Sequence, residues 1–355
     1  MRAIISGSCG LVGSSAVSRL LDNGWQVVGI DNNSREEFFG AEGSTKPILT
    51  QFIGHPHYVH HSIDVTHQGL IEDLFRSVVG ADLVIHCAAQ PSHDWSTMHI
   101  RRDFEINAIG TLNMLQAWHK FCSNSPFIHL STSKVYGDNP NRLKLLEYPT
   151  RYDLRPGHDM WHGIPESFPL DQCIHSFFGV SKLSGDLLAQ EYGRRFRLPV
   201  SILRPGCVTG GNHKGVELHG FLNYLVKCVA AGKEYKIIGY KGKQVRCNIH
   251  ADDLVDAALK LASHTSTSAN SEDCGAVYNI GGRGLDCSIL EAIEICEEIC
   301  GRKAITTQVE SPRVGDHQWW VSDSRKLRRR LDWSPRMDLQ STIRDIYEGI
   351  AYMRV

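Results

Sequence analysis

The chain has 355 residues, 42% hydrophobic and 22% charged, and its 38 basic and 39 acidic side chains leave a net charge of −1. It lacks the basic excess typical of nucleic-acid-binding proteins, and no apolar run reaches the roughly 18 residues that a membrane-spanning helix needs. Its eleven cysteines show no paired spacing. We therefore expect free thiols in a cytoplasmic α/β protein without partners among nucleic acids or membranes and without a metal site.

The first 31 residues contain the clearest local pattern. Arg2–Ser6 is a short apolar run that predicts a buried strand, and the glycine-rich turn Gly7–Gly13 follows it. Hydrophobic residues from Leu11 to Leu21 recur at helical spacing, and Trp25–Ile30 reads as a second strand that ends at Asp31. A strand–turn–helix–strand unit of about 30 residues with an acid at this place is typical of dinucleotide binding.

Each glycine of the turn has a specific use. Gly7 permits the tight turn out of the strand, Gly10 lets a pyrophosphate approach the backbone, and Gly13 lets the helix pack closely on the sheet. The helix start, at Leu11 and Val12, presents free N–H groups and the positive end of the helix dipole to a phosphate. The alternative is a glycine-rich turn that binds nothing.

Asp31 decides which dinucleotide we expect. Its carboxylate is placed to accept hydrogen bonds from an adenosine ribose, and it would repel a 2′-phosphate. We therefore predict NAD rather than NADP, although the nearby Arg35 weakens that preference.

The next segments continue the alternation of strands and helices. The polar residues 35–51 predict a loop over the adenosine. Tyr58–Ile63 predicts a third strand, and Asp64 after it is placed to bond the adenine amino group, to cap a helix over residues 68–79, or to do both. A fourth strand over residues 83–90 runs into small residues, where Ala88 and Ala89 would let the backbone approach a dinucleotide. His86 within it reads as a core histidine.

The second half of this alternation brings further candidates. We expect a long helix over Asp103–Phe121, a fifth strand over Phe127–Leu130, and a polar insertion over residues 138–172. A helix over Asp171–Arg195 carries Phe178 and Lys182 one turn apart, and a sixth strand follows over residues 200–203. We therefore predict a Rossmann-type doubly wound parallel sheet in residues 1–205 and a smaller α+β lobe in residues 206–355, with the chain crossing between them.

Together these motifs resemble the extended short-chain dehydrogenase/reductase family, in its nucleotide-sugar epimerase and dehydratase branch. The segments that carry the resemblance span nearly the whole chain: Gly7–Gly13, Asp31-Asn32, Asp64-Val65, His86–Gln90, Asn107–Thr111, Ser131–Gly137, Lys182, Arg204-Pro205, Gly242–Arg246, Ile249–Asp253, Asn279–Gly282 and Arg313–Asp316. Two of them, Thr132–Asp138 and Gly242–Arg246, look most like the CDP-paratose (CDP-tyvelose) 2-epimerases.

The resemblance implies an isomerase that oxidises a sugar hydroxyl to a ketone with NAD and reduces it again, at C2 of a CDP-deoxyhexose. It also implies a homodimer joined through the helices Asp103–Phe121 and Asp171–Arg195. The implied cofactor-binding residues are Gly7, Gly10, Leu11, Val12, Gly13, Asp31, Asn32, Ser34, Arg35, Asp64, Val65, Ala88, Ala89, Gln90, Asn107, Lys182 and Pro205. The implied substrate-binding residues are Gln90, Thr132, Cys207, His219, Arg246, Arg313 and Asp316.

Roles follow for some of these residues. By the resemblance, Arg246 and Arg313 hold the diphosphate and ribose of the nucleotide sugar, which suits the fork geometry of guanidinium groups. Asp316 bonds the nucleotide ribose. The alternatives are a surface arginine on a strand and a solvated loop acid.

The chain departs from the family at position 178. Family members carry a tyrosine there, whose phenolate takes the sugar hydroxyl proton beside the lysine and a Ser or Thr, here Lys182 and Thr132. Phe178 has no such proton. The open alternatives are another base (Tyr136, His93, His175 or a water held by Thr132 and Lys182), a modified chemistry, or binding without turnover.

Two rival functions remain beside the C2 epimerase. One is a C4 epimerase or a 4,6-dehydratase with the same ketone chemistry. Ser133-Lys134 argues against the dehydratase, because that branch usually carries an Asp-Glu pair after the threonine. The other is a sugar-nucleotide-binding homologue with reduced activity.

Overall fold

The computed structural model describes residues 1–78, 80–213, 215–217, 219–267, 273–313 and 315–352. The chain divides into two compact units. The first unit contains Met1–Thr132, Phe177–Arg204 and Leu254–Tyr278, and the second contains Ser133–Ser176, Pro205–Asp253 and the chain from Asn279 on. The sequence predicted a boundary after Pro205 with the chain crossing between the lobes, and each unit here is built from three segments of the chain.

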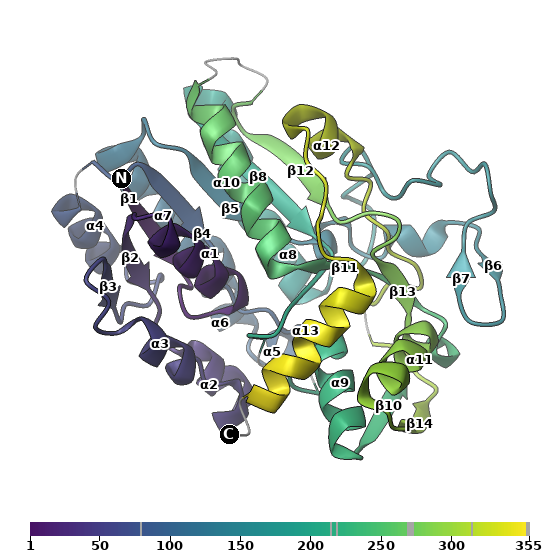
Figure 1. Ribbon diagram of the computed structural model, residues 1–355. Coiled ribbons are helices and arrows are strands. Elements are labelled where there is room, and N and C mark those ends of the chain that lie inside the picture. Colours follow the sequence, from purple (N-terminus) through teal and green to yellow (C-terminus); the bar gives the residue numbers. More distant parts are fainter. Residues whose placement is uncertain (79, 214, 218, 268–272, 314, 353–355) are drawn as a thin grey trace. The chain divides into compact units, whose positions relative to one another are not determined.

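A seven-stranded sheet forms the centre of the first unit (Figure 1). Its order is β12-β8-β5-β4-β1-β2-β3, and the pairings from β3 to β8 are all parallel. The strands are β1 (Arg2–Ser6), β2 (Gln26–Ile30), β3 (Tyr58–His61), β4 (Leu83–His86), β5 (Phe127–Leu130), β8 (Val200–Pro205) and β12 (Ala276–Ile280). The strand order reverses between β1 and β4, so the predicted doubly wound Rossmann-type fold is confirmed, with its switch point beside the glycine turn.

Helices cover both faces of this sheet. Helices α1 (Leu11–Asp22) and α10 (Ala251–Thr267) lie in front of the strands in Figure 1 and are joined by an ion pair between Arg19 and Asp256 at 3.8 Å. The other face is covered by α4 (Gln68–Ser77), α7 (Gly110–Cys122) and α8 (Ser176–Phe196), whose apolar side chains share one core with the strands. Trp118 and Phe75 are the largest members of that core contributed by helices. The carboxyl ends of the strands, where the glycine turn and Asp31 lie, are therefore supported by a helical layer on each face of the sheet.

The predicted loop over residues 35–51 is wrong. The segment forms α2 (Ser34–Phe39), the short turn η1 (Ala41–Gly43) and α3 (Lys46–Phe52). Phe38 is buried against Trp95 with 4.7 Å between the rings, and Ile48 and Phe52 bury one face of α3. Spacing of four residues between Ile48 and Phe52 is helical, and this short signal was outweighed by the polar composition of the segment.

Two predicted helices differ in their bounds. The first begins earlier, as α5 (His93–Met98) and α6 (Ile100–Phe104), and continues through a π-helical turn, η2 (Glu105–Ile109), into α7. The second begins at Ser176 rather than Asp171. The residues before it are held outside the helix, because Ile174 donates to Asp138 Oδ1 at 2.9 Å and accepts from the Asp138 N–H at 2.9 Å. Helix α4 ends at Ser77, and its predicted end at Val79 lies outside the described residues.

The second unit is a mixture of short strands and helices. Strand β11 (Val245–His250) lies between β13 (Asp286–Ser288) and β9 (Cys207–Thr209), and β10 (Glu234–Ile238) pairs with β14 (Ile305–Val309). Helices α9 (Phe221–Ala231), α11 (Ile289–Cys300) and α13 (Leu339–Tyr352) share its apolar core. The remaining elements are η3 (Ser133–Tyr136), η4 (Asn139–Arg142), β6 (Leu146–Glu147), β7 (Tyr152–Asp153), η5 (Tyr240–Gly242) and α12 (Arg325–Leu331).

The polar insertion over residues 138–172 is tied to this core by charges. Arg283 donates to both carboxylate oxygens of Asp153 at 2.7 and 2.8 Å, and its guanidinium lies 4.0 Å over the ring of Trp161. Arg151 of the insertion pairs with Glu291 at 3.2 Å. The insertion is therefore part of the second unit's framework.

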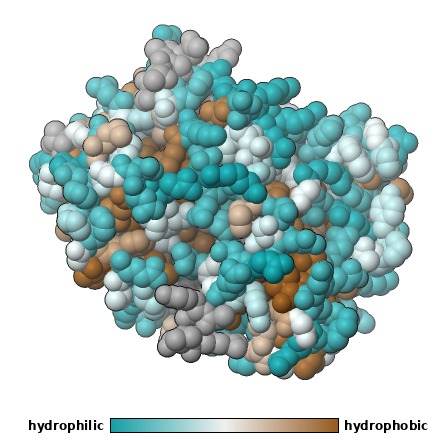
Figure 2. Space-filling model, viewed as in Figure 1, coloured by the Kyte–Doolittle hydropathy of each residue, from teal (hydrophilic) through white to brown (hydrophobic). Residues whose placement is uncertain are grey.

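The surface and the cysteines agree with the composition. The face shown in Figure 2 is mostly hydrophilic, with hydrophobic residues in small separate patches, an ordinary distribution for a globular protein. All eleven cysteines are free thiols. Within the described ranges, every helix falls short of the length and apolar character that crossing a membrane requires.

Candidate functional site

The glycine turn of the first unit forms a cradle with little room for side chains. Gly7 has a φ of +67°, and a Cβ there would lie 2.8 Å from the backbone nitrogen of Ala88. A Cβ on Gly13 would lie 2.0 Å from the carbonyl oxygen of Gly7. Gly10 is the N-cap of α1, and no side chain caps the helix. The N–H groups at Leu11 and Val12 therefore start a helix whose anion-binding end is not covered by a cap, which fits a pyrophosphate.

Asp31 at the end of β2 organises the backbone around the cradle. Its carboxylate accepts hydrogen bonds from the N–H groups of Cys9 at 3.0 Å and Asn33 at 2.9 Å. Each carboxylate oxygen can accept a further bond, so the predicted bond from an adenosine ribose has capacity left. Arg35 stacks on Phe39 at 4.8 Å, and burial lowers the pKa of its guanidinium to about 10.

The next strand end carries a second polar cluster. Asp64 accepts from the Thr66 N–H at 2.9 Å, from Asn32 Nδ2 at 3.1 Å and from Arg102 at 2.5 Å. Burial raises the pKa of its carboxyl, but the hydrogen bonds from Arg102 and Thr66 bring it below its usual value. The N-cap of α4 is His67, so the alternative prediction that Asp64 caps that helix is wrong. Ser34 lies beside this cluster and donates to Asn32 Oδ1 at 2.6 Å.

The loop after β4 is held by Asn107 on the π-helical turn. Asn107 Nδ2 donates to the carbonyl of Gln90 at 3.1 Å, and its Oδ1 accepts from the Gln90 N–H at 2.9 Å. Ala88 and Ala89 in the same loop are half-buried, and Val65 is buried beneath the preceding cluster. His86 bonds Ser6 at 2.6 Å and Thr111 at 3.0 Å, which confirms the prediction of a core histidine.

Asp103 is a site neighbour that the sequence analysis missed. It is fully buried, accepts from Ser181 Oγ at 2.5 Å and from Asn107 Nδ2 at 3.1 Å, and burial raises its pKa to about 6. Its hydrogen bonds fix Ser181, the residue before Lys182. An acid in a polar helix start gives no sequence signal that distinguishes it from a surface residue.

Lys182 and Phe178 both lie on the buried face of α8. Lys182 Nζ donates to the carbonyl of Leu130 at 2.7 Å, and burial lowers its pKa to about 8, with Asp186 opposing that shift. The ring of Phe178 lies edge-on to His93 with 5.0 Å between the centroids. Ser96 fixes this contact, because its hydroxyl donates to the His93 carbonyl at 2.7 Å and accepts from the Phe178 N–H at 3.2 Å.

Two other predicted base candidates lie in the second unit and are engaged there. Tyr136 is fully buried, donates to Asn279 Oδ1 at 2.9 Å and packs against Trp320. His175 Nε2 donates to the Val135 carbonyl at 3.0 Å. Thr132, which was predicted to hold a water together with Lys182, is the last residue of the first unit and is half-buried.

Three of the predicted substrate-binding residues of the second unit, Cys207, Arg246 and Asp316, lie in one cluster. Arg246 pairs with Asp316 Oδ1 at 2.7 Å, and Lys134 approaches the same oxygen at 3.4 Å. Cys207 is close enough for the charges of this cluster to act on its thiol, whose pKa is raised mainly by burial. Lys134 was not predicted as a site residue, and nothing in its local sequence indicates that it meets Arg246, more than 100 positions away.

Three predicted residues occupy other positions. Arg313 donates to the Glu217 carbonyl at 3.2 Å. His219 packs edge-on to His213 with 5.4 Å between the rings. Pro205 is the buried end of β8. Their predicted roles in binding stay predictions.

Comparisons with known proteins agree with these features. Residues 3–281 match the NAD dependent epimerase/dehydratase family. The chain is 30% identical over 354 residues to CDP-paratose 2-epimerase from Salmonella typhi, covering 98% of each chain. It is 26% identical over 349 residues to UDP-glucose 4-epimerase from Mycolicibacterium smegmatis, covering 97% of this chain and 96% of the relative.

Solved structures show the same fold. UDP-glucose 4-epimerase from Thermotoga maritima with UDP-glucose has a TM-score of 0.79 at 23% identity and is covered over 100% of both chains. A tyrosine-to-phenylalanine variant of UDP-glucuronic acid 4-epimerase from Bacillus cereus, in complex with UDP-4-deoxy-4-fluoro-glucuronic acid and NAD, has a TM-score of 0.77 at 24% identity, over 99% of this chain and 100% of that one.

Proposed function

Because this chain belongs to the NAD dependent epimerase/dehydratase family, we propose that it epimerises C2 of a CDP-linked deoxyhexose. The sugar hydroxyl would be oxidised to a ketone and reduced again on the other face. The observation that carries the proposal is the 30% identity to CDP-paratose 2-epimerase over 98% of both chains. Ser133-Lys134 after Thr132 supports an epimerase over a 4,6-dehydratase.

The residues of the first unit fit NAD, the cofactor of this family. When bound, NAD supplies a reversible hydride acceptor, so no outside reductant is needed. We propose that the glycine cradle and the start of α1 hold its pyrophosphate, that Asp31 bonds the adenosine ribose, and that Asp64 faces the adenine. Lys182 would donate to the nicotinamide ribose, because its ammonium reaches from the buried face of α8 to Leu130 at the carboxyl end of β5.

The proton of the sugar hydroxyl needs an acceptor other than Phe178. We propose His93, because its imidazole lies against the Phe178 ring, 5.0 Å between centroids, and Ser96 joins the backbones of the two residues by hydrogen bonds. An imidazole can accept a proton and return it, which suits this task. The Tyr136 hydroxyl donates to Asn279, and the His175 ring donates to the Val135 carbonyl, both inside the second unit.

Product analysis tests the reaction. Purified protein would be incubated with CDP-, UDP-, GDP- and dTDP-linked sugars in heavy water, and the products followed by NMR and mass spectrometry. We expect a C2 epimer of a CDP-sugar without deuterium at that carbon. A C4 epimer would replace the C2 assignment, and loss of water with deuterium uptake would show a dehydratase.

Matched variants test the proton acceptor. His93→Phe keeps an aromatic ring against Phe178 but removes the titratable nitrogen, and we expect kcat to fall about 100-fold. Phe178→Tyr in that background should restore activity, since a phenol would again stand one turn before Lys182. Unchanged kcat in His93→Phe would contradict the role of His93.

A second candidate function follows from Phe178 alone. A homologue that binds a sugar nucleotide without turnover would show binding of CDP-sugar and NAD but no product, and Phe178→Tyr would then raise activity from that baseline. Product formation by the wild-type protein would exclude this candidate.

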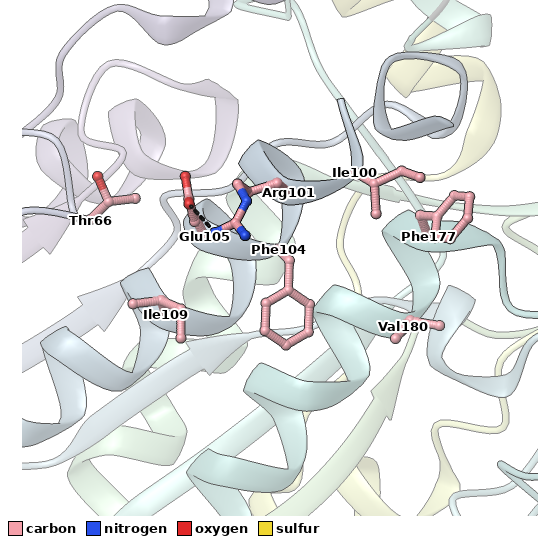
Figure 3. Close-up of a pocket in the computed structure, with 8 residues that line it drawn as sticks. All are labelled: Thr66, Ile100, Arg101, Phe104, Glu105, Ile109, Phe177 and Val180. Atoms are coloured by element: carbon pink, nitrogen blue, oxygen red, sulfur yellow. Dashed lines mark ion pairs between the residues drawn. The ribbon is translucent and has the colours of Figure 1, made fainter. Parts of the chain in front are cut away.

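We further propose a cytoplasmic homodimer, a location that the eleven free thiols support. A groove in the first unit is lined by residues of α6, η2 and α8 and by Thr66: Thr66, Ile100, Arg101, Phe104, Glu105, Ile109, Phe177 and Val180 (Figure 3). Phe104, Phe177 and Val180 are 40–46% exposed there, and monomers rarely leave large apolar patches uncovered. These are the helices through which the family resemblance implies a second copy to pack.

Sedimentation velocity tests the dimer. Phe104→Glu should shift the protein to a monomer, while Leu70→Glu, at a 51% exposed position on α4, should leave the dimer intact. A monomeric wild-type protein at micromolar concentration would overturn the proposal.

A further inference from the structure

The cluster around Asp316 contains a cation that the proposed function does not use. Lys134 lies on η3, two residues after Thr132, and its Nζ donates to the carbonyl of Gly315 at 3.1 Å and approaches Asp316 Oδ1 at 3.4 Å. Arg246 pairs with the same carboxylate oxygen at 2.7 Å. Two cations therefore converge on one oxygen of one carboxylate.

We propose that Lys134 binds the diphosphate of the nucleotide sugar together with Arg246, an inference that rests on the proposed function. In a nucleotide sugar the diphosphate lies between the ribose and the sugar. Lys134 stands two residues from Thr132, which is predicted to bond the sugar, and contacts Asp316, which is predicted to bond the ribose. Its place in the chain and its contacts thus match the middle of the ligand.

The Arg246 guanidinium is held in place for such a ligand. Its second nitrogen donates to the carbonyls of Val245 at 2.9 Å and His317 at 2.6 Å, so its direction is fixed before any ligand binds. The side chains of Lys134, Arg246 and Asp316 keep 16%, 11% and 21% of their surface exposed. The charges are thus shielded from bulk water yet within reach of an anion, where charge-assisted hydrogen bonds are strong.

Two titratable neighbours of this cluster, His317 and Cys207, are held in their neutral forms. His317 is buried and donates from Nε2 to the Gly137 carbonyl at 2.7 Å, and burial beside the two cations holds its pKa well below its usual value. Burial raises the pKa of the Cys207 thiol, which keeps it protonated. Burial lowers the pKa of Lys134 itself, and a bound diphosphate would oppose that shift by favouring the charged ammonium.

Lysine suits the task because it can change partners. Its ammonium is a compact charge with three donors on a flexible stem. A short movement from Asp316 toward a phosphate oxygen would leave the carboxylate to Arg246 and to the ribose hydroxyls. A fixed arginine and a movable lysine can therefore hold a diphosphate from two sides.

Calorimetric binding measurements test the inference on the full chain. CDP, UDP, GDP and dTDP would be titrated into wild-type protein, followed by the matching nucleoside without phosphates. Lys134→Met should weaken binding of the preferred nucleoside diphosphate by about 10- to 100-fold, the loss expected for one hydrogen bond between charged groups. Affinity for the nucleoside and for NAD should stay unchanged.

Two variants serve as controls. Lys134→Arg keeps the positive charge but not the compact ammonium, so its loss of affinity for the nucleoside diphosphate should be smaller than that of Lys134→Met. Lys236→Met removes a lysine of the same unit that is 51% exposed and paired with Glu217 at 3.1 Å, and it should change nothing.

The outcomes distinguish a failure of the role of Lys134 from a failure of the proposed function. Binding of a nucleoside diphosphate by Lys134→Met with wild-type affinity would overturn the role of Lys134 and leave the proposed function standing. If wild-type protein bound none of the four nucleoside diphosphates, the proposed function and this inference would both fail. An equal loss for the nucleoside and its diphosphate would show a structural effect and would also overturn the inference.

Discussion

Two carboxylates of this chain have a lysine and an arginine nearby, and they differ in how completely they are enclosed. Asp186 in the first unit is fully buried, and Arg204 donates to both of its oxygens at 2.9 and 2.7 Å. Ser131 at 2.5 Å and Gln190 at 2.6 Å occupy the remaining positions. In the second unit, Asp316 stays 21% exposed and receives Lys134 and Arg246 on a single oxygen.

The difference separates architecture from ligand binding. Around Asp186 every charge has its partner inside the protein, so the cluster joins α8 to β8. It also places a negative charge close to Lys182. Around Asp316 the positive charges exceed the negative one within reach of solvent, and such a site gains from an anion. Substitutions at the two carboxylates should therefore have opposite balances of stability and binding effects.

The largest effect is expected for Asp186→Asn. The substitution leaves Arg204, only 2% exposed, as a buried charge without its counter-ion, a change that costs about 3–5 kcal/mol of unfolding free energy. Urea denaturation followed by circular dichroism measures it. The double variant Asp186→Asn with Arg204→Met removes the orphaned charge and should recover part of the loss. A cost below about 1 kcal/mol would show that Asp186 is as open as Asp316.

Local patterns were sufficient to predict the cradle. The strand, the glycine turn, α1, β2 and Asp31 follow each other within 31 residues, in the order and spacing typical of a dinucleotide-binding unit. The helices in residues 34–52 were missed because their apolar faces consist of two or three residues each, such as Phe38 and Phe52. The start of α8 was misplaced because the pairing of Ile174 with Asp138 is a contact across the insertion.

The parts of the site that depend on contacts between distant positions in the chain could not be predicted from the sequence. Phe178 was recognised as a departure because its helix and Lys182 are local neighbours. The contact of Phe178 with His93 and the meeting of Lys134 with Arg246 depend on how loops after different strands turn. Asp103 gave no signal because burial, and not residue type, raises its pKa. These contacts and this burial become visible only in the folded structure.

An intermediate effect is expected from the titration of Lys182, which lies beside the closed cluster, the buried group of Asp186, Arg204, Ser131 and Gln190. Its pKa is about 8 in the folded protein against an ordinary 10.5, so between these values the unfolded chain binds more protons and stability rises with pH. Below pH 8 the burial cost is fully present. Over this window Lys182 should contribute a rise of about 3 kcal/mol.

Lys182→Met isolates that contribution. Asp186, Asp103, Cys87, His86 and His129 face the same ammonium electrostatically, and they remain in both proteins. The difference in unfolding free energy between wild type and Lys182→Met, measured by urea denaturation from pH 7 to 10.5, should shift in favour of wild type by the stated amount. A difference that is flat with pH would mean that solvent reaches the ammonium and that the cluster is not closed.

The smallest effect on stability is expected for Asp316→Asn, the matched substitution at the open carboxylate. Partly exposed ion pairs contribute about 0–1 kcal/mol, so unfolding free energy should fall by less than about 1 kcal/mol. Because Lys134 and Arg246 would lose their shared counter-ion, inorganic pyrophosphate should bind several-fold more tightly to Asp316→Asn than to wild type in isothermal titration, and this gain should fade at high salt. Weaker pyrophosphate binding would show that Asp316 positions the two cations, and that the open cluster needs its carboxylate as much as the closed one does.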